Sequence, residues 1–360
     1  MEGDHVGMGF QHGRQAADLR GAIIKRIAAV ESKLADDRAD AAFSDLIAET
    51  AAVLARHSPQ TIAVMRGLSA GLDLPYEALL RYNLAPFLRD VLTTRQRLAE
   101  EGRTTEGCTT WAATGTATAD GGPILAKNRD YAHKHLALQT IIRATPEGGY
   151  RYTYVTSAGS PGVFVAGFNE AGLAVVDTHV STTDTGAGLP MYALAMHVLE
   201  EHSRVRSALD YLCAAPRLGR NNLILADASG DIACFEAGHA HYSVREAAGN
   251  ILVNTNHFND AEMPATFVDT EPEELRGNSF QRYQQATQAL AGRAGQIDLA
   301  WAEALMRSHD APPASICRHP HGADESATIA SIFLLPAQRT MVFHQGQPCA
   351  PAAPRAVFHY

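Results

Sequence analysis

The chain has 360 residues, of which 46% are hydrophobic, and a formal net charge of −9. This length allows one large domain or two smaller ones, and the hydrophobic content predicts a sizeable ordered core. The negative charge argues against a nucleic-acid partner and against a role at anionic membranes. Residues 1–10 are polar, and no apolar window approaches the ~20 residues of a membrane helix. We therefore predict neither a signal peptide nor a membrane span.

The cysteines are odd in number and scattered along the chain, at Cys108, Cys213, Cys234, Cys317 and Cys349. A disulfide framework in a small secreted protein normally shows an even number of cysteines. The pattern favours free thiols in a reducing compartment, and we predict a cytoplasmic location.

Residues 13–98 show apolar side chains at helical spacing, as in Ile23, Ile27 and Val30. A break at residues 73–75 includes Pro75, which suits the start of a helix over residues 77–92. Residues 93–106 are polar and charged, so we predict an exposed connector there.

From Cys108 onward the expected elements are mostly strands, because turn residues separate pairs of short apolar runs. The expected strands are residues 108–119, 123–131, 139–144, 150–156, 163–168, 173–180, 223–227, 231–236, 251–254, 329–335 and 340–344. The expected helices are residues 191–202, 205–213, 280–290 and 299–308. Hairpin connections predict antiparallel sheets, so the pattern indicates an α+β fold.

The stretch Gly107-Cys108-Thr109-Thr110-Trp111 opens the first of these strands. A turn at Asp120-Gly121-Gly122 leads into the return strand, which carries Lys127-Asn128-Arg129-Asp130. One hairpin is therefore expected to bring a thiol and a carboxylate together.

A cysteine thiol is a strong nucleophile when a base removes its proton. That base can be a histidine, as in papain-like enzymes, or the cysteine's own α-amino group if the bond before it is cut. An α-amino group titrates near ~7.7–8, which suits proton transfer from a thiol. Gly107 tolerates the strained backbone that such a cut requires. We expect Cys213, Cys234 and Cys349 to be structural.

Four short motifs occur in one order along the chain: Gly107-Cys108, Asn128 with Asp130, Asn169-Glu170, and Asn256. This order resembles the family of acyl-CoA:isopenicillin N acyltransferase, whose members are N-terminal nucleophile hydrolases. The resemblance implies a four-layer αββα sandwich of two stacked antiparallel sheets. It also implies self-cleavage between Gly107 and Cys108. The products would be an α chain of residues 1–107, retained in the fold, and a β chain of residues 108–360 that carries the catalytic core.

The resemblance assigns roles to further residues. Cys108 is the nucleophile, and Asp130 orients its new α-amino group. The side-chain amide of Asn256 and the backbone N–H at His179, or at Thr178 if the count slips by one, would bind the oxyanion. The supporting positions implied are Thr110, Asn128 and Arg282.

Related bile-salt hydrolases and penicillin V acylases carry an additional arginine that has no clear match in this chain. Lys127 is at most a remote substitute for that arginine, and we give it little weight.

Cys317-Arg318-His319-Pro320-His321 has residue types that bind metals. No Cys-x-x-Cys or His-x-x-x-His partner accompanies it, and the resembled family carries a similar run without a metal. We therefore predict no metal, and the absence of a phosphate-binding glycine loop predicts no organic cofactor.

The main hypothesis is a self-processing cysteine amidohydrolase or acyltransferase that acts on a small N-acyl amide or acyl thioester. A homo-oligomer is compatible with it. Two alternatives stay open: a conventional thiol protease that pairs Cys108 with His179 or His257, and an uncleaved protein that binds an acylated metabolite.

Overall fold

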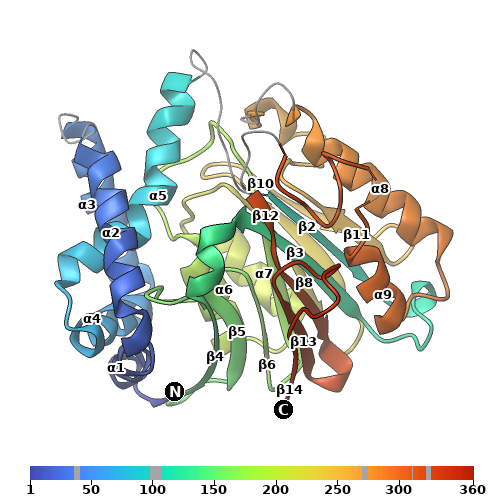
Figure 1. Cartoon of the computed structure of the whole chain (residues 1–360), viewed down its shortest axis with the longest axis horizontal. Helices are drawn as coiled ribbons and strands as arrows, with labels where there is room; N and C mark the ends of the chain where they lie inside the picture. Colours follow the sequence, from blue (N-terminus) through green and yellow to red (C-terminus); the bar gives the residue numbers. More distant parts are fainter. Residues whose placement is uncertain (36–40, 98–106, 270–274, 310, 322–325) are drawn as a thin grey trace.

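The computed structural model describes residues 1–35, 41–97, 107–269, 275–309, 311–321 and 326–360. Two β-sheets lie face to face, with helices covering the outer face of each (Figure 1). This is the predicted four-layer αββα sandwich of an α+β fold.

The larger sheet has eight strands in the order β1-β4-β5-β6-β7-β8-β9-β10. Their bounds are β1 Glu2–Gly3, β4 Gln139–Pro146, β5 Tyr152–Ser157, β6 Ala166–Asn169, β7 Leu173–His179, β8 Asn221–Asp227, β9 Ile232–Ala237 and β10 Tyr242–Glu246. Consecutive strands from β4 to β10 pair antiparallel, and β1 pairs parallel with β4. Strands β7 and β8 are joined through two helices within residues 191–214 and not by a hairpin.

The smaller sheet has six strands in the order β11-β2-β3-β12-β13-β14, all antiparallel. Their bounds are β2 Gly107–Ala113, β3 Ile124–Ala132, β11 Ile251–Asn254, β12 Ser326–Leu335, β13 Thr340–Gln345 and β14 Arg355–His359. The hairpin that begins with Cys108 therefore lies inside this sheet, between β11 and β12.

The helices form the two outer layers. They are α1 His5–Gln15, α2 Arg20–Ala35, α3 Ala41–His57, α4 Pro59–Leu72, α5 Tyr76–Arg97, α6 Met191–Glu201, α7 Val205–Ala214, α8 Asn278–Gly292 and α9 Leu299–Met306. Apolar side chains of α1 and α3–α7 pack on the larger sheet, and those of α8 and α9 on the smaller one. A third apolar layer, including Phe168, Ile224 and Ile332, fills the space between the sheets.

Alternation along β2 and β3 sends neighbouring side chains to opposite faces. Ala112 and Leu125 point into the space between the sheets, whereas Trp111 and Ala126 point toward α8 and α9. By the same alternation Cys108 and Lys127 face the larger sheet, and Asn128 and Asp130 face the helical layer.

Several element predictions are corrected by the structure. Helix α1 begins at His5, in a stretch too rich in glycine to suggest a helix. Its glycines allow close contact with α4: a methyl group at Gly9 would lie 2.1 Å from the carbonyl oxygen of Val64. Helix α5 continues to Arg97, so residues 93–97 are helical and only residues 98–106 of the expected connector lie outside the described chain. Strand β2 ends at Ala113 and not near residue 119.

Strands β1, β10 and β14 were not predicted from the sequence. Side chains of β10 and β14 alternate between exposed and half-buried, because both strands lie at sheet edges. Their mixed composition gives little alternating hydrophobic signal. Among the described helices, none is long and apolar enough to cross a membrane.

Candidate active site

The β2–β3 hairpin sets the positions of the two principal candidates. In its ladder Gly107 lies opposite Asp130, and Cys108 opposite Arg129. Cys108 is 8% exposed and Asp130 is 1% exposed, so both are nearly removed from solvent. The hairpin therefore places Cys108 and Asp130 on neighbouring rungs of the ladder, and both residues line the same cavity.

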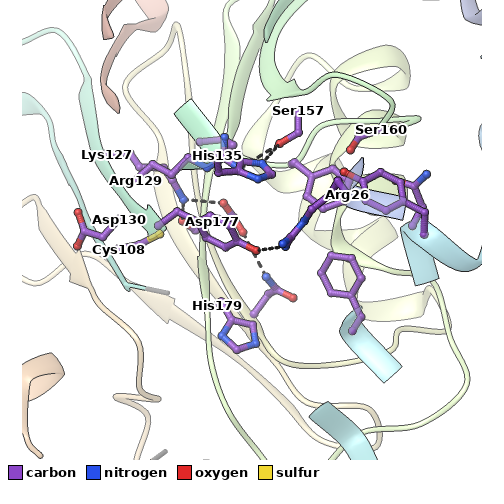
Figure 2. A pocket seen from close by; sticks show the side chains of 17 residues that line it. Arg26, Cys108, Lys127, Arg129, Asp130, His135, Ser157, Ser160, Asp177 and His179 are labelled. Atoms are coloured by element: carbon purple, nitrogen blue, oxygen red, sulfur yellow. Dashed lines mark hydrogen bonds and ion pairs between the residues drawn. The ribbon is translucent and has the colours of Figure 1, made fainter. Parts of the chain in front are cut away.

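The Cys108 thiol opens into a cavity of about 130 Å³ between the sheets and the N-terminal helices. Figure 2 shows Lys127, Asp130 and Asp177 near Cys108, with Arg26, Ser157 and Ser160 farther from the sulfur. Apolar walls come from Phe87, Phe164 and Val165. Helices α2 and α5 contribute Arg26, Tyr82, Asn83 and Phe87, so residues from both sides of the Gly107–Cys108 bond build the cavity.

The thiol lies among charged groups. Burial raises the pKa of the Cys108 thiol; the Lys127 ammonium opposes this rise, while the carboxylates of Asp177 and Asp130 add to it. The backbone of Asp130 also acts to lower the pKa of the thiol, as the smallest of these effects. In the uncut chain the thiol is therefore mostly protonated near neutral pH, and an additional base is needed to activate it.

Lys127 is a charged residue inside the protein, with 1% of its surface exposed. Its Nζ donates to the backbone oxygen of Asp177 and, at 2.7 Å, to the carboxylate oxygen Oδ1. Burial opposes the charge, but Asp177 and Cys108 outweigh it and raise the pKa of Lys127. Asn221 donates to the other Asp177 oxygen at 3.2 Å. The ammonium beside the sulfur is thus held by a buried ion pair.

Asp130 has one occupied and one open carboxylate oxygen. Oδ1 accepts a hydrogen bond from Thr328 Oγ1 at 2.7 Å. Oδ2 is buried and has no hydrogen-bond partner within the described part of the chain. A methyl group added to Gly107 would lie 3.1 Å from this oxygen. A buried carboxylate oxygen without a donor is costly, and this one lies next to the bond predicted to be cut.

Asn256 and Arg282 hold the backbone of Cys108 from the helical side. Asn256 Oδ1 accepts from the Cys108 N–H at 2.9 Å and from Arg282 Nη2 at 2.8 Å. Arg282 is fully buried and also donates to the Cys108 carbonyl oxygen at 2.5 Å and to Thr109 Oγ1 at 3.1 Å. From the sequence a solvent-exposed arginine was as compatible as a buried one. In the structure Arg282 contacts the Cys108 carbonyl directly and the Cys108 N–H through Asn256.

The predicted oxyanion donors lie next to each other. Asn256 Nδ2 donates to the backbone oxygen of His179 at 2.9 Å. The His179 ring accepts from Arg220 Nη2 at 2.7 Å, so its hydrogen is on Nδ1. Their proposed joint role in binding an oxyanion stays a prediction.

The two remaining supporting candidates anchor neighbouring elements. Asn128 Nδ2 donates to the backbone oxygens of Met306 and Ile316 at 2.8 and 2.9 Å, which ties β3 to the end of α9. Thr110 Oγ1 donates to the Asn254 backbone oxygen at 3.2 Å across the β2–β11 ladder.

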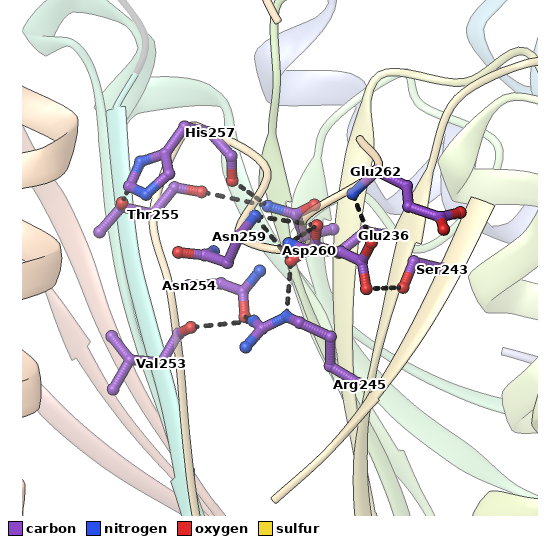
Figure 3. A network of polar contacts seen from close by, with 11 residues as sticks. Glu236, Ser243, Arg245, Val253, Asn254, Thr255, His257, Asn259, Asp260 and Glu262 are labelled. Carbon is purple, nitrogen blue, oxygen red and sulfur yellow. Dashed lines mark hydrogen bonds and ion pairs between the residues drawn. The ribbon is translucent and has the colours of Figure 1, made fainter. Parts of the chain in front are cut away.

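A buried charged network positions the segment that carries Asn256 (Figure 3). Glu236 on β9 is fully buried and accepts from Arg245 Nε at 2.7 Å. It also accepts from the backbone N–H groups of Asn259 and Asp260. Arg245 in turn donates to Asn254 Oδ1 at 2.6 Å. The larger sheet is thereby linked to the strand and loop on both sides of Asn256.

Histidines near the cavity have other partners than the thiol. His135 Nε2 lies 2.7 Å from Ser157 Oγ, and burial together with Arg129 and Arg26 lowers the pKa of His135 to about 3. His257 contacts Thr255 and Ser279, and burial lowers its pKa to about 4. Within the described ranges no histidine hydrogen-bonds Cys108.

Two stacked antiparallel sheets between helical layers, with a cysteine at the start of a central strand, define the chain as having the N-terminal nucleophile hydrolase fold. The family model for acyl-coenzyme A:6-aminopenicillanic acid acyl-transferase matches residues 117–350, which is more than half of the chain. The chain belongs to this family. The matched range begins after Cys108 and includes Asp130, Asn256 and Arg282.

Several solved structures are similar to this chain at low identity. A mutant of conjugated bile acid hydrolase from Clostridium perfringens is 12% identical, covering 70% of this chain and 97% of that one, with a TM-score of 0.46. Penicillin V acylase from Agrobacterium tumefaciens is 17% identical, with coverages of 70% and 86% and a TM-score of 0.44. The Caenorhabditis elegans orthologue of N-acylethanolamine-hydrolyzing acid amidase is 15% identical, with coverages of 64% and 93% and a TM-score of 0.44. No curated protein sequence matches the chain.

The sequence-based prediction gave Lys127 little weight as a site residue and did not include its partner Asp177. Period-two alternation from Cys108 and from Asp130 places Lys127 on the thiol's face of the hairpin, which was the available signal. Asp177 lies on a different sheet, and no spacing along the chain links it to Lys127.

Proposed function

We propose that this protein is a self-processing cysteine amidohydrolase or acyltransferase that acts on a small N-acyl amide or acyl thioester. The observation that supports it best is the placement of Cys108: its thiol faces a cavity, while Asn256 and Arg282 hold its backbone. Family membership supports the same reaction class.

The first reaction is the cut before Cys108. Its sulfur attacks the carbonyl carbon of Gly107, the C–N bond breaks, and the nitrogen takes up a proton, which gives a thioester and a free amine. Water then hydrolyses the thioester to a Gly107 carboxylate and a free thiol. Lys127, beside the sulfur, favours the thiolate needed for the attack.

The cut creates the base for the second reaction. The new α-amino group of Cys108 replaces an amide N–H that donates to Asn256. The open oxygen of Asp130, next to Gly107, is an acceptor that can orient this amine. A neutral amine takes the thiol proton, and the thiolate attacks the acyl donor. The C–N or C–S bond of the donor breaks, the α-ammonium returns the proton to the departing amine or thiol, and a thioester acyl-enzyme remains.

The tetrahedral intermediate needs hydrogen-bond donors, each worth about 3–4 kcal/mol of barrier. We assign this role to the Asn256 amide and the His179 backbone N–H. In the uncut chain Asn256 Nδ2 donates to the His179 oxygen, so the assignment requires that this bond gives way to substrate. Water or an amine then accepts the acyl group.

The two alternatives are less well supported. A thiol–histidine protease requires a histidine at the sulfur, but His135 and His179, which line the cavity, bond to Ser157 and Arg220. The hypothesis of a non-enzymatic binding protein does not explain why a buried ion pair lies beside the thiol.

Intact-mass measurement of purified full-length protein tests the cut. We expect two fragments that meet at Gly107/Cys108, a single intact chain for Cys108→Ala, and normal cleavage for the control Cys213→Ser. Cleavage that persists in Cys108→Ala, or a wild-type chain that stays whole, would contradict the proposal.

A panel of N-acyl amides that varies acyl length then tests turnover. We expect an acyl adduct on the fragment that begins at Cys108, released by hydroxylamine. Turnover by an uncut chain would instead favour the thiol–histidine alternative.

A further inference from the structure

The Cys317-Arg318-His319 run has partners that lie far away in the sequence. Cys317 lies in the segment between α9 and β12, and Cys349 lies in the turn between β13 and β14. His319 Nε2 is 3.9 Å from Cys317 Sγ and 3.3 Å from Cys349 Sγ. One ligand atom each of His309, His319 and Cys349 lie within 4.8 Å of one another. None of these four residues lines the cavity at Cys108.

We propose that Cys317, Cys349, His319 and His309 form a zinc site that joins the segment after α9 to the turn after β13. Two cysteines and two histidines are a common tetrahedral ligand set for zinc. Bond lengths near 2.3 Å to sulfur and 2.0–2.1 Å to nitrogen put neighbouring ligand atoms roughly 3.4–3.8 Å apart. The two sulfur–nitrogen distances, 3.3 and 3.9 Å, are close to this range.

The surroundings of the two histidines suit metal binding. His309 Nδ1 is 3.0 Å from the Arg307 backbone oxygen, which fixes its hydrogen on Nδ1 and leaves Nε2 for the ion. The Gln347 amide is 3.0 Å from His319 Nδ1. If the Gln347 side chain turns its oxygen toward His319, it can accept a hydrogen bond from His319 Nδ1–H, and His319 Nε2 is then free to bind the ion. This turn would break the 3.2 Å hydrogen bond from Gln347 Nε2 to the Arg318 backbone oxygen. Both rings are exposed, so an ion can enter from solvent.

The site would act on the catalytic region through Arg318. This residue lies between the ligands Cys317 and His319 and is 2% exposed. Its backbone pairs with Thr328, whose hydroxyl donates to Asp130. Its Nη1 would lie 2.7 Å from a methyl group placed on Gly107. A bound ion would therefore hold the segment that packs against the bond before Cys108, without touching the reacting atoms.

Cobalt titration of the full-length chain, reduced and freed of metal with a chelator, tests the proposal. We expect about one Co²⁺ per chain with the absorption of tetrahedral cobalt and a sulfur-to-cobalt charge-transfer band, displaced by Zn²⁺. Cys317→Ser and Cys349→Ser should remove the charge-transfer intensity in steps, whereas the matched control Cys213→Ser should keep it. Melting temperature measured with and without Zn²⁺ shows whether each variant still folds.

Substitutions at exposed and partly exposed positions test metal binding without a large effect on folding. His309 is exposed, and His309→Asn should weaken Co²⁺ binding about tenfold or more with the fold intact. Gln347→Glu should tighten binding, because a carboxylate accepts from His319 Nδ1–H more strongly than an amide. The proposal is overturned if no cobalt band appears, if the band survives in Cys317→Ser/Cys349→Ser, or if these cysteines form a disulfide while Zn²⁺ is present.

Discussion

Gly107 lacks a side chain at a place where there is no room for one. A methyl group there would lie 2.7 Å from Arg318 Nη1 and 3.1 Å from Asp130 Oδ2. We expect Gly107→Ala to slow self-cleavage roughly 10- to 100-fold, because it displaces groups beside the reacting bond. Fragment formation over time, followed by mass spectrometry, measures the rate. Gly21→Ala, where a methyl meets nothing within 4 Å, serves as control, and an unchanged rate in Gly107→Ala would refute the steric argument.

Three buried histidines make the fold sensitive to acid. Burial, the first cause for each, lowers the pKa of His12 and His257 to about 4 and, with nearby arginines, that of His135 to about 3. The unfolded chain binds more protons than the folded one below pH ~6.5, so stability is full above that pH and falls as pH drops toward 4. Each histidine should cost about 2 kcal/mol of unfolding free energy at pH 5.

Urea unfolding at pH 7 and pH 5 measures this loss. His135→Asn should recover about a third of the total difference, whereas the exposed His57→Asn should recover none. Equal losses in the wild type and His135→Asn would rule out this origin for the acid sensitivity.

At the residue scale, the sequence led to Cys108, Asp130, Asn256 and Arg282, and the structure brings these four together. The order of the motifs was sufficient to predict these residues, and each of the other three contacts the backbone of Cys108 or pairs with its neighbour Gly107. Motif order could not reveal the open oxygen of Asp130, since that depends on every donor packed around it.

At the element scale, helix α2 presents a cation to the cavity. Arg26 Nη2 donates to the Tyr131 hydroxyl at 3.0 Å, and the described chain provides Arg26 with no carboxylate partner. A carboxylate on the substrate could bind there, and a charge-assisted hydrogen bond is worth about 1.5–3 kcal/mol. We expect Arg26→Gln to lower kcat/KM roughly tenfold or more for carboxylate-bearing N-acyl amides.

Neutral analogues provide the comparison for Arg26→Gln, since their kcat/KM should change little. Lys25→Gln, on an exposed position of the same helix, is the control variant. Equal losses for charged and neutral substrates would show that Arg26 supports the fold and does not select the ligand.

Strands β9, β10 and β11 depend on the Glu236–Arg245 pair. Arg245→Met would leave a fully buried carboxylate without its cation, which typically costs about 3–5 kcal/mol. We expect a loss of this size in the free energy of unfolding measured in urea. Arg151→Met breaks an ion pair whose arginine is 54% exposed and should cost less than about 1 kcal/mol. Similar losses for both variants would contradict the role of burial.

Elements with a strong pattern were predictable, and those stabilised by tertiary contacts were not. The β2–β3 hairpin follows from the turn residues Asp120-Gly121-Gly122, and the break before α5 from Pro75. Helix α1 is stabilised by glycine contacts with α4, and β14 pairs along the edge strand β13. Neither contact leaves a periodic signal within its own segment.

For the whole molecule, the N-terminal helices and the sheets share one apolar core. Leu54, Leu84 and Leu88 pack in the same cluster as Tyr152 and Met191. We expect residues 108–360 expressed alone to aggregate, because this apolar face would be exposed. Co-expression with residues 1–107 should restore a complex that elutes as one species in gel filtration. A monodisperse, active β chain without its partner would contradict this expectation.

The position of the proposed scissile bond determines how self-cleavage would affect the smaller sheet. Gly107 is the first rung of the β2–β3 ladder, and the pairs from Cys108 to Ala113 all belong to the downstream fragment. A break there removes a single terminal rung, so the new amine emerges at the end of an intact ladder. If the proposed cut occurs, the precursor can complete its folding first, and activation would change one end of one strand without a rearrangement of either sheet.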